Sequence, residues 1–229
     1  MKINNMLPAG AALIAIALVM VSCGKKSVAD IRFSEGQNIT NLSKYVSSIE
    51  LIPLSRGGAG TFSQHAELAL AGGDYIIADI DSSKIFRYSA KGDFLNEIGS
   101  RGNADGQFNG IGSFQVIGGD VIVFSRLGET LRYSLDGKLV SSATDSKIGY
   151  QSYVLDKDTL TYFGHQYPKR ANRLALMKDN TEFPYLEDKV NVFPLTSTAP
   201  VFSQGRNGVD VVDSYSPSIY CYNNMTVSK

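Results

Sequence analysis

The chain has 229 residues, of which 43% are hydrophobic, so it is long enough to bury a sizeable core. Its 22 basic residues balance its 22 acidic residues, which excludes a general electrostatic attraction to nucleic acid or to an anionic membrane surface. The sequence contains 12 Tyr, 11 Phe and 22 Gly but no Trp, a composition that suits short strands joined by tight turns. The composition therefore favours an all-β fold.

The N-terminal residues have the pattern of an export signal. Lys2 precedes an apolar run from Ala11 to Val21, which is shorter than the roughly 20 apolar residues of a membrane span. The run ends in Met20-Val21-Ser22-Cys23, which resembles the bacterial lipobox, although that motif usually begins with Leu. We expect residues 1–22 to be a lipoprotein signal peptide, and residues 23–41 to be a tether that starts at the lipidated Cys23. The alternative is an uncleaved anchor in which Cys23 has no role.

The rest of the chain contains an internal repeat. The segment GGDYIIADIDSSKIFRYSAKGDFL begins at Gly72, and the similar segment GGDVIVFSRLGETLRYSLDGKLV begins at Gly118, which gives a period of about 45 residues. A weaker third copy covers residues 157–180, where Asn180 takes the place of a turn glycine. A fourth copy begins at Val211, where VVDSYSPSIYCY matches IADIDSSKIFRY of the first.

Each repeat has the pattern of four short strands. In the second copy the strands are expected at residues 113–117, 120–125, 130–134 and 138–144, with glycines between them. A single sheet of this kind cannot bury both of its faces, so the repeats must pack side by side as the blades of a propeller do. We predict an all-β fold in which residues 42–229 form a β-propeller of four-stranded blades.

Specific motifs add a resemblance to known families. The stretch from Ile85 to Phe108, with Lys91-Gly92, Ile98-Gly99 and Gly102 at its turns, resembles the NHL-type propeller repeat. The preceding LSKYVSSIELIPLS, which starts at Leu42, resembles the lead-in of six-bladed propeller lipoproteins of Bacteroides and its relatives. This resemblance implies six blades and a location in the cell envelope, but no shared catalytic residues.

The number of blades leaves two interpretations open. Four blades are expected, starting near His65, Ser113, Tyr150 and Ala199, whereas the similar family has six. In the first interpretation the chain is a truncated product of a longer six-bladed protein. In the second, four blades close on themselves and residues 46–54 supply the outer strand of the fourth. The first is favoured, because NNMTVSK at residues 223–229 already begins an outer strand.

Two loops have a superficial likeness to ligand-binding motifs. Gly99 to Gly106 is glycine-rich, but it lacks the Lys-Ser/Thr pair and the helix of a phosphate-binding loop. Asp79 to Lys84 begins with the spacing of a calcium loop, but Lys84 stands where that loop needs glycine, and no glutamate occupies the twelfth position. We interpret both loops as connections between strands, and we predict no metal and no cofactor.

The sequence contains no arrangement typical of a catalytic site. His65 and His165 are the only histidines, too few for a multi-histidine metal site. No Gly-x-Ser-x-Gly motif is present, and we predict no catalytic residue. The second cysteine, Cys221, is expected to be a small apolar residue on a strand. One observation favours an enzyme: Asp79 and Asp213 occupy equivalent strand ends, and related propellers hold a metal through carboxylates.

Taken together, these patterns predict a binding or scaffold protein rather than an enzyme. We expect lipid on Cys23 to hold it at the outer membrane, where it binds a protein or glycan partner and no nucleic acid. Residues 24–27 lack the acidic cluster that marks surface display in Bacteroides-type lipoproteins, so the periplasmic face is preferred to the cell surface. The alternatives are a metal-dependent hydrolase or lyase, and a non-functional remnant of a longer gene.

Overall fold

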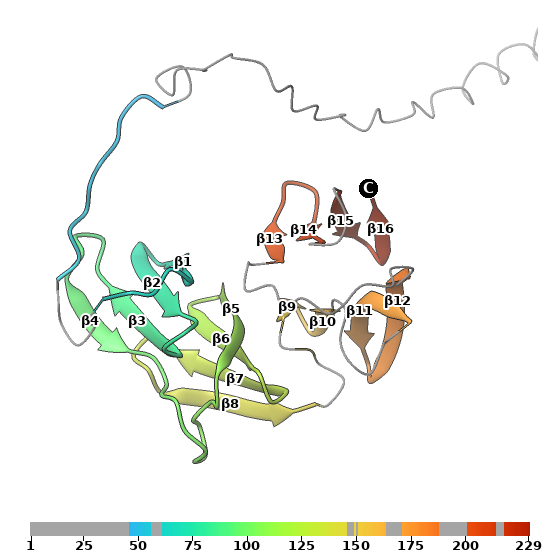
Figure 1. Ribbon diagram of the computed structural model, residues 1–229, viewed down its shortest axis with the longest axis horizontal. Coiled ribbons are helices and arrows are strands. Elements are labelled where there is room, and N and C mark those ends of the chain that lie inside the picture. Colours follow the sequence, from blue (N-terminus) through green and yellow to red (C-terminus); the bar gives the residue numbers. More distant parts are fainter. Residues whose placement is uncertain are drawn as a thin grey trace, which may run out of the picture. The chain divides into compact units, whose positions relative to one another are not determined.

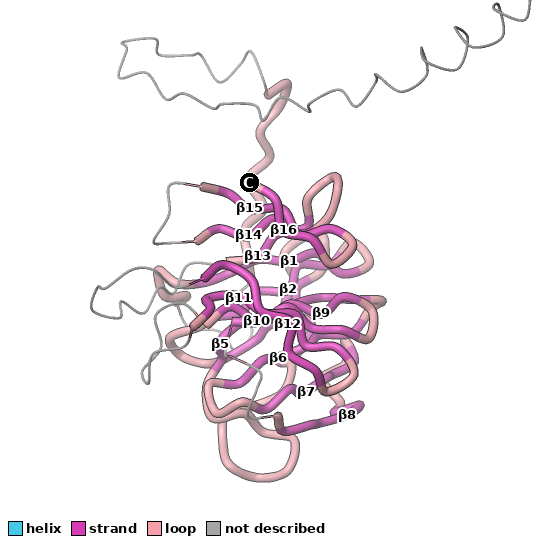
Figure 2. The backbone as a smooth tube through the Cα atoms, turned by 90° about the vertical axis from the view of Figure 1, so that its right-hand side faces the viewer, coloured by secondary structure: helices cyan, strands magenta, loops and turns pink. Residues whose placement is uncertain are grey.

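The computed structural model describes residues 46–55, 61–145, 149, 151–163, 171–187, 201–213 and 218–229. Within these ranges the chain forms strands and no helix (Figure 2). The prediction of an all-β fold is therefore confirmed.

The strands form four sheets, each with four antiparallel strands in chain order (Figure 1). The first sheet contains β1 (Ala66–Ala71), β2 (Asp74–Asp79), β3 (Lys84–Tyr88) and β4 (Phe94–Glu97). The second contains β5 (Ile111–Ile117), β6 (Asp120–Ser125), β7 (Glu129–Ser134) and β8 (Leu139–Thr144). The third contains β9 (Gln151–Leu155), β10 (Asp158–Tyr162), β11 (Asn172–Lys178) and β12 (Thr181–Glu187), and the fourth contains β13 (Phe202–Gln204), β14 (Val209–Val212), β15 (Ile219–Asn223) and β16 (Thr226–Ser228).

The predicted repeat is visible in the register of the strands. The β1–β2 turn is Gly72-Gly73 and the β5–β6 turn is Gly118-Gly119, all with positive φ. In the third sheet, Asp179 and Asn180 make the β11–β12 turn with φ of 47° and 61°, as the alignment of the repeats predicted for Asn180. Polar residues that tolerate positive φ thus replace glycine where the repeat is weakest.

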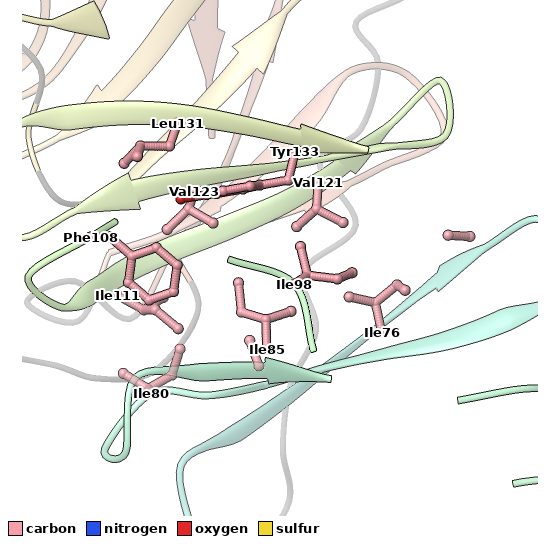
Figure 3. Packing of buried hydrophobic residues seen from close by; sticks show 12 residues of the cluster. Ile76, Ile80, Ile85, Ile98, Phe108, Ile111, Val121, Val123, Leu131 and Tyr133 are labelled. Carbon is pink, nitrogen blue, oxygen red and sulfur yellow. The ribbon is translucent and has the colours of Figure 1, made fainter. Parts of the chain in front are cut away.

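The first two sheets share one hydrophobic core. Ile76 and Ile85 of the first sheet face Val121 and Tyr133 of the second, with other apolar side chains between them (Figure 3). The fully buried members from both sheets and their connection include Ile98, Phe108, Ile111 and Val123. A second core joins the third and fourth sheets in the same way, through Leu160, Leu174, Leu176, Val209, Val211 and Tyr222. Each sheet therefore buries one face against its neighbour.

The motif Phe86-Arg87-Tyr88 shows how one strand serves both faces of its sheet. Phe86 and Tyr88 are buried on one face, together with Phe62 and Phe94, in edge-to-face ring contacts. Arg87 points to the opposite face, where its Nε donates to Asp74 at 2.7 Å and its Nη1 donates to the Leu135 carbonyl of the second sheet at 3.2 Å. Packing of the two rings explains the motif, and the arginine between them joins two sheets.

The outer strand that the second, less favoured interpretation assigns to residues 46–54 is not formed. Residues 46–55 contain no strand, and β16 provides the outer strand of the fourth sheet. The Ser55 amide donates to the Gly92 carbonyl at 2.8 Å, and the Ser55 Oγ accepts a bond from the Phe94 amide at 2.7 Å. The interpretation in which Val46 to Leu54 completes the fourth blade is therefore wrong: this lead-in meets the β3–β4 connection of the first sheet.

Gly92 allows this contact, and its substitution should disrupt it. Gly92 has a φ of 87°, and a Cβ there would lie 2.2 Å from the Pro53 carbonyl oxygen. Gly119 has a similar φ of 90°, but a Cβ there would meet nothing within 4 Å. We expect Gly119→Ala to lower the free energy of unfolding by about 1–2 kcal/mol through backbone strain alone. Gly92→Ala should lower the free energy of unfolding, measured by urea denaturation, by at least about 1 kcal/mol more than Gly119→Ala does, because its Cβ would also collide with Pro53. Equal losses would contradict the close approach of the lead-in.

Candidate functional site

The innermost strands of the four sheets line a single cavity of about 510 Å³. The lining comes from residues 66–69 of the β1 region, 112–116 of β5, 151–153 of β9 and 201–204 of the β13 region. The lining includes polar side chains from all four strands, among them Glu67, Ser113, Gln151 and Gln204, beside apolar ones. The cavity thus presents hydroxyl, amide and carboxyl groups on strands held by the surrounding sheets.

Between β5 and β9, side chains of β5 make the backbone hydrogen bonds that a neighbouring strand would otherwise make. The Gln115 amide donates to the Val154 carbonyl at 3.3 Å and accepts from the Val154 amide at 2.8 Å. The Ser113 hydroxyl makes the same pair of bonds with the Ser152 backbone, at 3.3 Å and 3.1 Å. Two polar side chains therefore satisfy the edge of β9 that does not pair with β10.

A long side chain on β9 connects β9 to β13. The Tyr153 hydroxyl on β9 donates to the Gln204 Oε1 on β13 at 2.9 Å. The rings of Tyr153 and Phe202 also contact each other, with centroids 5.9 Å apart. The hydroxyl and ring of one tyrosine thus connect the third and fourth sheets at the cavity.

Glu67 on β1 is the one carboxyl group among the described residues that line the cavity. Within the described ranges its carboxyl group makes no hydrogen bond and no ion pair. Burial raises the pKa of Glu67 from 4.5 to about 7, because water that would solvate the charge is partly excluded. Glu67 is therefore an unpaired and partly desolvated acid inside a polar cavity.

A family model described as a 6-bladed beta-propeller (DUF5128) matches residues 22–229 of the chain, and it decides the identity of the repeating sheets. The chain belongs to this family of six-bladed propellers. The four sheets are blades, and the cavity lies at their inner strands. The prediction of a propeller of four-stranded blades is confirmed.

One solved structure with a TM-score above 0.5 agrees with the propeller fold. A candidate exported protein of Bacteroides fragilis is similar, with a TM-score of 0.69 at 13% identity, over 79% of this chain and 53% of that chain. This propeller thus spans about half the length of that protein. The designed protein Ika4 has a TM-score of 0.42 at 12% identity (76% of this chain, 98% of that chain), and a Bacteroides caccae protein of unknown function has 0.39 at 16% (68% and 60%). The sequence matches none of the curated proteins.

Asp79 and Asp213 have separate partners, and both lie outside the cavity lining. Asp79 ends β2 and accepts bonds from the Ser63 amide at 3.0 Å and from the Ser63 hydroxyl at 2.6 Å. Burial acts to raise the pKa of Asp79, but the hydrogen bonds from Ser63 and Ser82 outweigh it and hold that pKa below its usual value. Asp213 follows β14, where it pairs with Arg173 at 2.9 Å and accepts from the Tyr162 hydroxyl at 2.7 Å. The equivalence of the two strand ends was predicted correctly, but neither carboxylate lines the cavity.

The remaining candidate residues are placed as follows. His65 lies one residue before β1, not within it, and its Nδ1 is 2.9 Å from an Asp81 oxygen. His165 and Cys23 lie outside the described residues. Cys221 lies on β15, as predicted, and burial raises the pKa of its thiol. Gly99 to Gly106 belongs to the connection from β4 to β5, which agrees with its interpretation as a step between blades.

Two further properties hold for the described residues as a set. Among them, no group of three or more His, Cys, Asp or Glu side chains is arranged to hold a metal ion. The same ranges contain no helix that is both long and apolar enough to cross a membrane.

Sequence reasoning missed Glu67, Ser113 and Gln115. A signal for Glu67 was present, since Ala66 to Ala71 is otherwise composed of Ala and Leu, and a lone carboxyl group in an apolar inner strand needs a reason. The roles of Ser113 and Gln115 depend on the distance to a strand about 39 residues away, which the repeat alone does not give.

The raised pKa of Glu67 predicts a pH dependence of stability. The folded protein holds this proton more tightly than the unfolded chain, so the stabilisation is fully present below about pH 4.5 and is lost as the pH rises through about 7. Because solvent screens the partly exposed group, we expect a loss on the order of 1 kcal/mol, or roughly 2–4 °C in Tm. Glu67→Gln should reduce the fall in Tm between pH 5 and pH 8 by that amount. An unchanged pH profile in the variant would contradict the assignment.

Proposed function

We propose that this propeller is a non-enzymatic binding protein of the cell envelope, whose cavity receives part of a protein or glycan partner. The observation that carries the proposal is the cavity itself: four inner strands present Glu67, Gln115, Tyr153 and Gln204 around about 510 Å³. A concave site with a few oriented polar groups on a rigid support is typical of ligand-binding sites. A fold of this kind serves many functions, so the proposal depends on the cavity and not on the family.

The exposed side chains of β1 also support binding at this place. Leu68 lines the cavity and is 62% exposed, although its strand is the innermost of its blade. An apolar side chain left in solvent beside polar groups can contribute binding free energy when a partner covers it. The cavity thus combines an apolar contact with hydrogen-bonding groups that orient a ligand.

The proposal includes a lipid anchor on Cys23 at the outer membrane, on the periplasmic face. The motif Met20-Val21-Ser22-Cys23 supports it, as does the name of the similar Bacteroides fragilis protein, which describes a candidate exported protein. Two or more acyl chains would hold the protein firmly, since each buried methylene contributes about 0.8 kcal/mol. The observation that favoured a metal-dependent hydrolase or lyase no longer supports it, because Asp79 and Asp213 have separate partners outside the cavity lining.

A matched pair of substitutions tests the cavity. Leu68 and Leu70 lie on the same strand with exposures of 62% and 65%, but only Leu68 lines the cavity. The tagged, membrane-anchored protein is solubilised in detergent and used to capture proteins from envelope extracts and to probe a glycan array. We expect Leu68→Arg to reduce the amount of captured partner at least tenfold, and Leu70→Arg to leave that amount unchanged. Equal capture by both variants, or no reproducible partner for the original protein, would refute the proposed function.

The anchor has its own test. Cells grown with radiolabelled palmitate should incorporate the label into the protein, which should sediment with outer-membrane vesicles. Cys23→Ala should carry no label and should leave the membrane fraction. Label that persists in the variant, or a protein that stays membrane-bound without label, would show that Cys23 is not the anchor.

A further inference from the structure

We propose that Glu67 forms a subsite for a cationic group, an ammonium or a guanidinium, of the ligand that enters the cavity. This inference rests on the proposed function and names the chemistry that the cavity selects. It concerns a basic amino-acid side chain, which a protein partner could insert or which a free amino acid could supply.

The first support is a comparison between neighbouring blades. Glu67 pairs with Ala78 in the register of β1 and β2, and Ser113 pairs with Phe124 at the equivalent place of β5 and β6. Ser113 uses its hydroxyl to bond the backbone of the next inner strand at Ser152. Glu67 makes no such bond to β5 within the described residues. The carboxyl group at this position therefore remains available to a ligand, whereas the equivalent hydroxyl is occupied by the wall.

The second support is the charge of the cavity lining. Its described residues include no Lys, Arg or His, and β5, β9 and β13 contribute no charged side chain to it. A partly desolvated carboxylate without a cation is unfavourable, and an incoming cation relieves that cost. An anionic ligand would meet the opposite effect. A neutral sugar could accept or donate hydrogen bonds but would leave the charge of Glu67 unpaired.

The third support is the character of the surrounding side chains. Phe114 and Phe202 line the cavity with Leu68 and Val116. Lysine and arginine carry long aliphatic stems below their charged ends, and such stems pack on apolar and aromatic surfaces. The lining thus offers one carboxyl group for the charged end and apolar surface for the stem.

Proton linkage gives the subsite a signature that simple packing would not produce. A bound cation stabilises the ionised form of Glu67, so binding lowers its pKa and releases a proton near neutral pH. The other titratable side chain of the lining is Tyr153, whose pKa is raised by burial, so it stays protonated in this range. Affinity for the cation should therefore increase as the pH rises through about 7.

Isothermal titration of the detergent-solubilised full chain tests the subsite. The probes are acetyl-Gly-Arg-Gly-amide, acetyl-Gly-Lys-Gly-amide and free arginine, and acetyl-Gly-Gln-Gly-amide is the neutral control. We expect the basic peptides to bind at least tenfold more tightly than the glutamine peptide at pH 8. Between pH 8 and pH 6 their affinity should fall by up to about tenfold, as expected for one group that titrates near pH 7. Titrations in two buffers of different ionisation enthalpy should show proton release.

The variants make the result specific to Glu67. Glu67→Gln should abolish both the preference for a basic probe and the proton release, while Glu97→Gln, at an exposed position of β4 outside the cavity lining, should leave both intact. Equal Tm values at pH 5 for the three proteins would exclude unfolding as the cause. Binding of the peptides but not of free arginine indicates a protein partner, and equal binding of both indicates a small ligand.

The outcomes separate this inference from the proposed function. Suppose that Leu68→Arg removes the captured partner. If no basic probe binds the original protein, or if Glu67→Gln binds the basic probes as well as the original protein does, the cationic subsite is refuted and the binding cavity stands. If the original protein captures no partner but still binds the basic probes through Glu67, the subsite stands and the proposed function falls.

Discussion

The structure depends on the need of each four-stranded sheet to cover an apolar face. A single twisted sheet of this size has apolar residues on both faces, and both faces would be exposed to water if the sheet were alone. The first blade meets this requirement by placing Ile76 and Ile85 against Val121 and Tyr133 of the second. The third and fourth blades repeat the solution with Leu174 and Val211. Everything at the cavity follows from this packing, because it positions the inner strands that supply the lining.

Polar contacts complete what the apolar cores begin. Arg87 reaches from the first blade to the Leu135 carbonyl of the second, and Gln115 reaches from the second to Val154 of the third. Tyr153 then reaches from the third blade to Gln204 of the fourth. Hydrogen bonds depend strongly on direction and distance, whereas apolar contacts tolerate small shifts. These three side chains therefore align neighbouring blades more narrowly than packing alone would.

The fold was largely predictable because its signals are local and repeated. Turn glycines such as Gly119 and Gly137, with alternating apolar residues between them, located the strands of the second blade within a few residues. The contact of the lead-in was not predictable, because it depends on two hydrogen bonds of Ser55 and on the missing Cβ of Gly92. The candidate site was missed for a related reason: whether Glu67 or Ser113 finds a partner depends on the distance to the next blade, which no local pattern encodes.

The side chains of Ser113 and Gln115 also cover a strand edge that could otherwise pair with another chain. An inner strand such as β9 exposes backbone donors and acceptors that an extended segment of another chain could pair with. Both bonding positions at Ser152 and Val154 are already taken by side chains of β5. A strand-like intruder would first have to displace them. This wall is therefore closed to the backbone pairing that begins fibre growth.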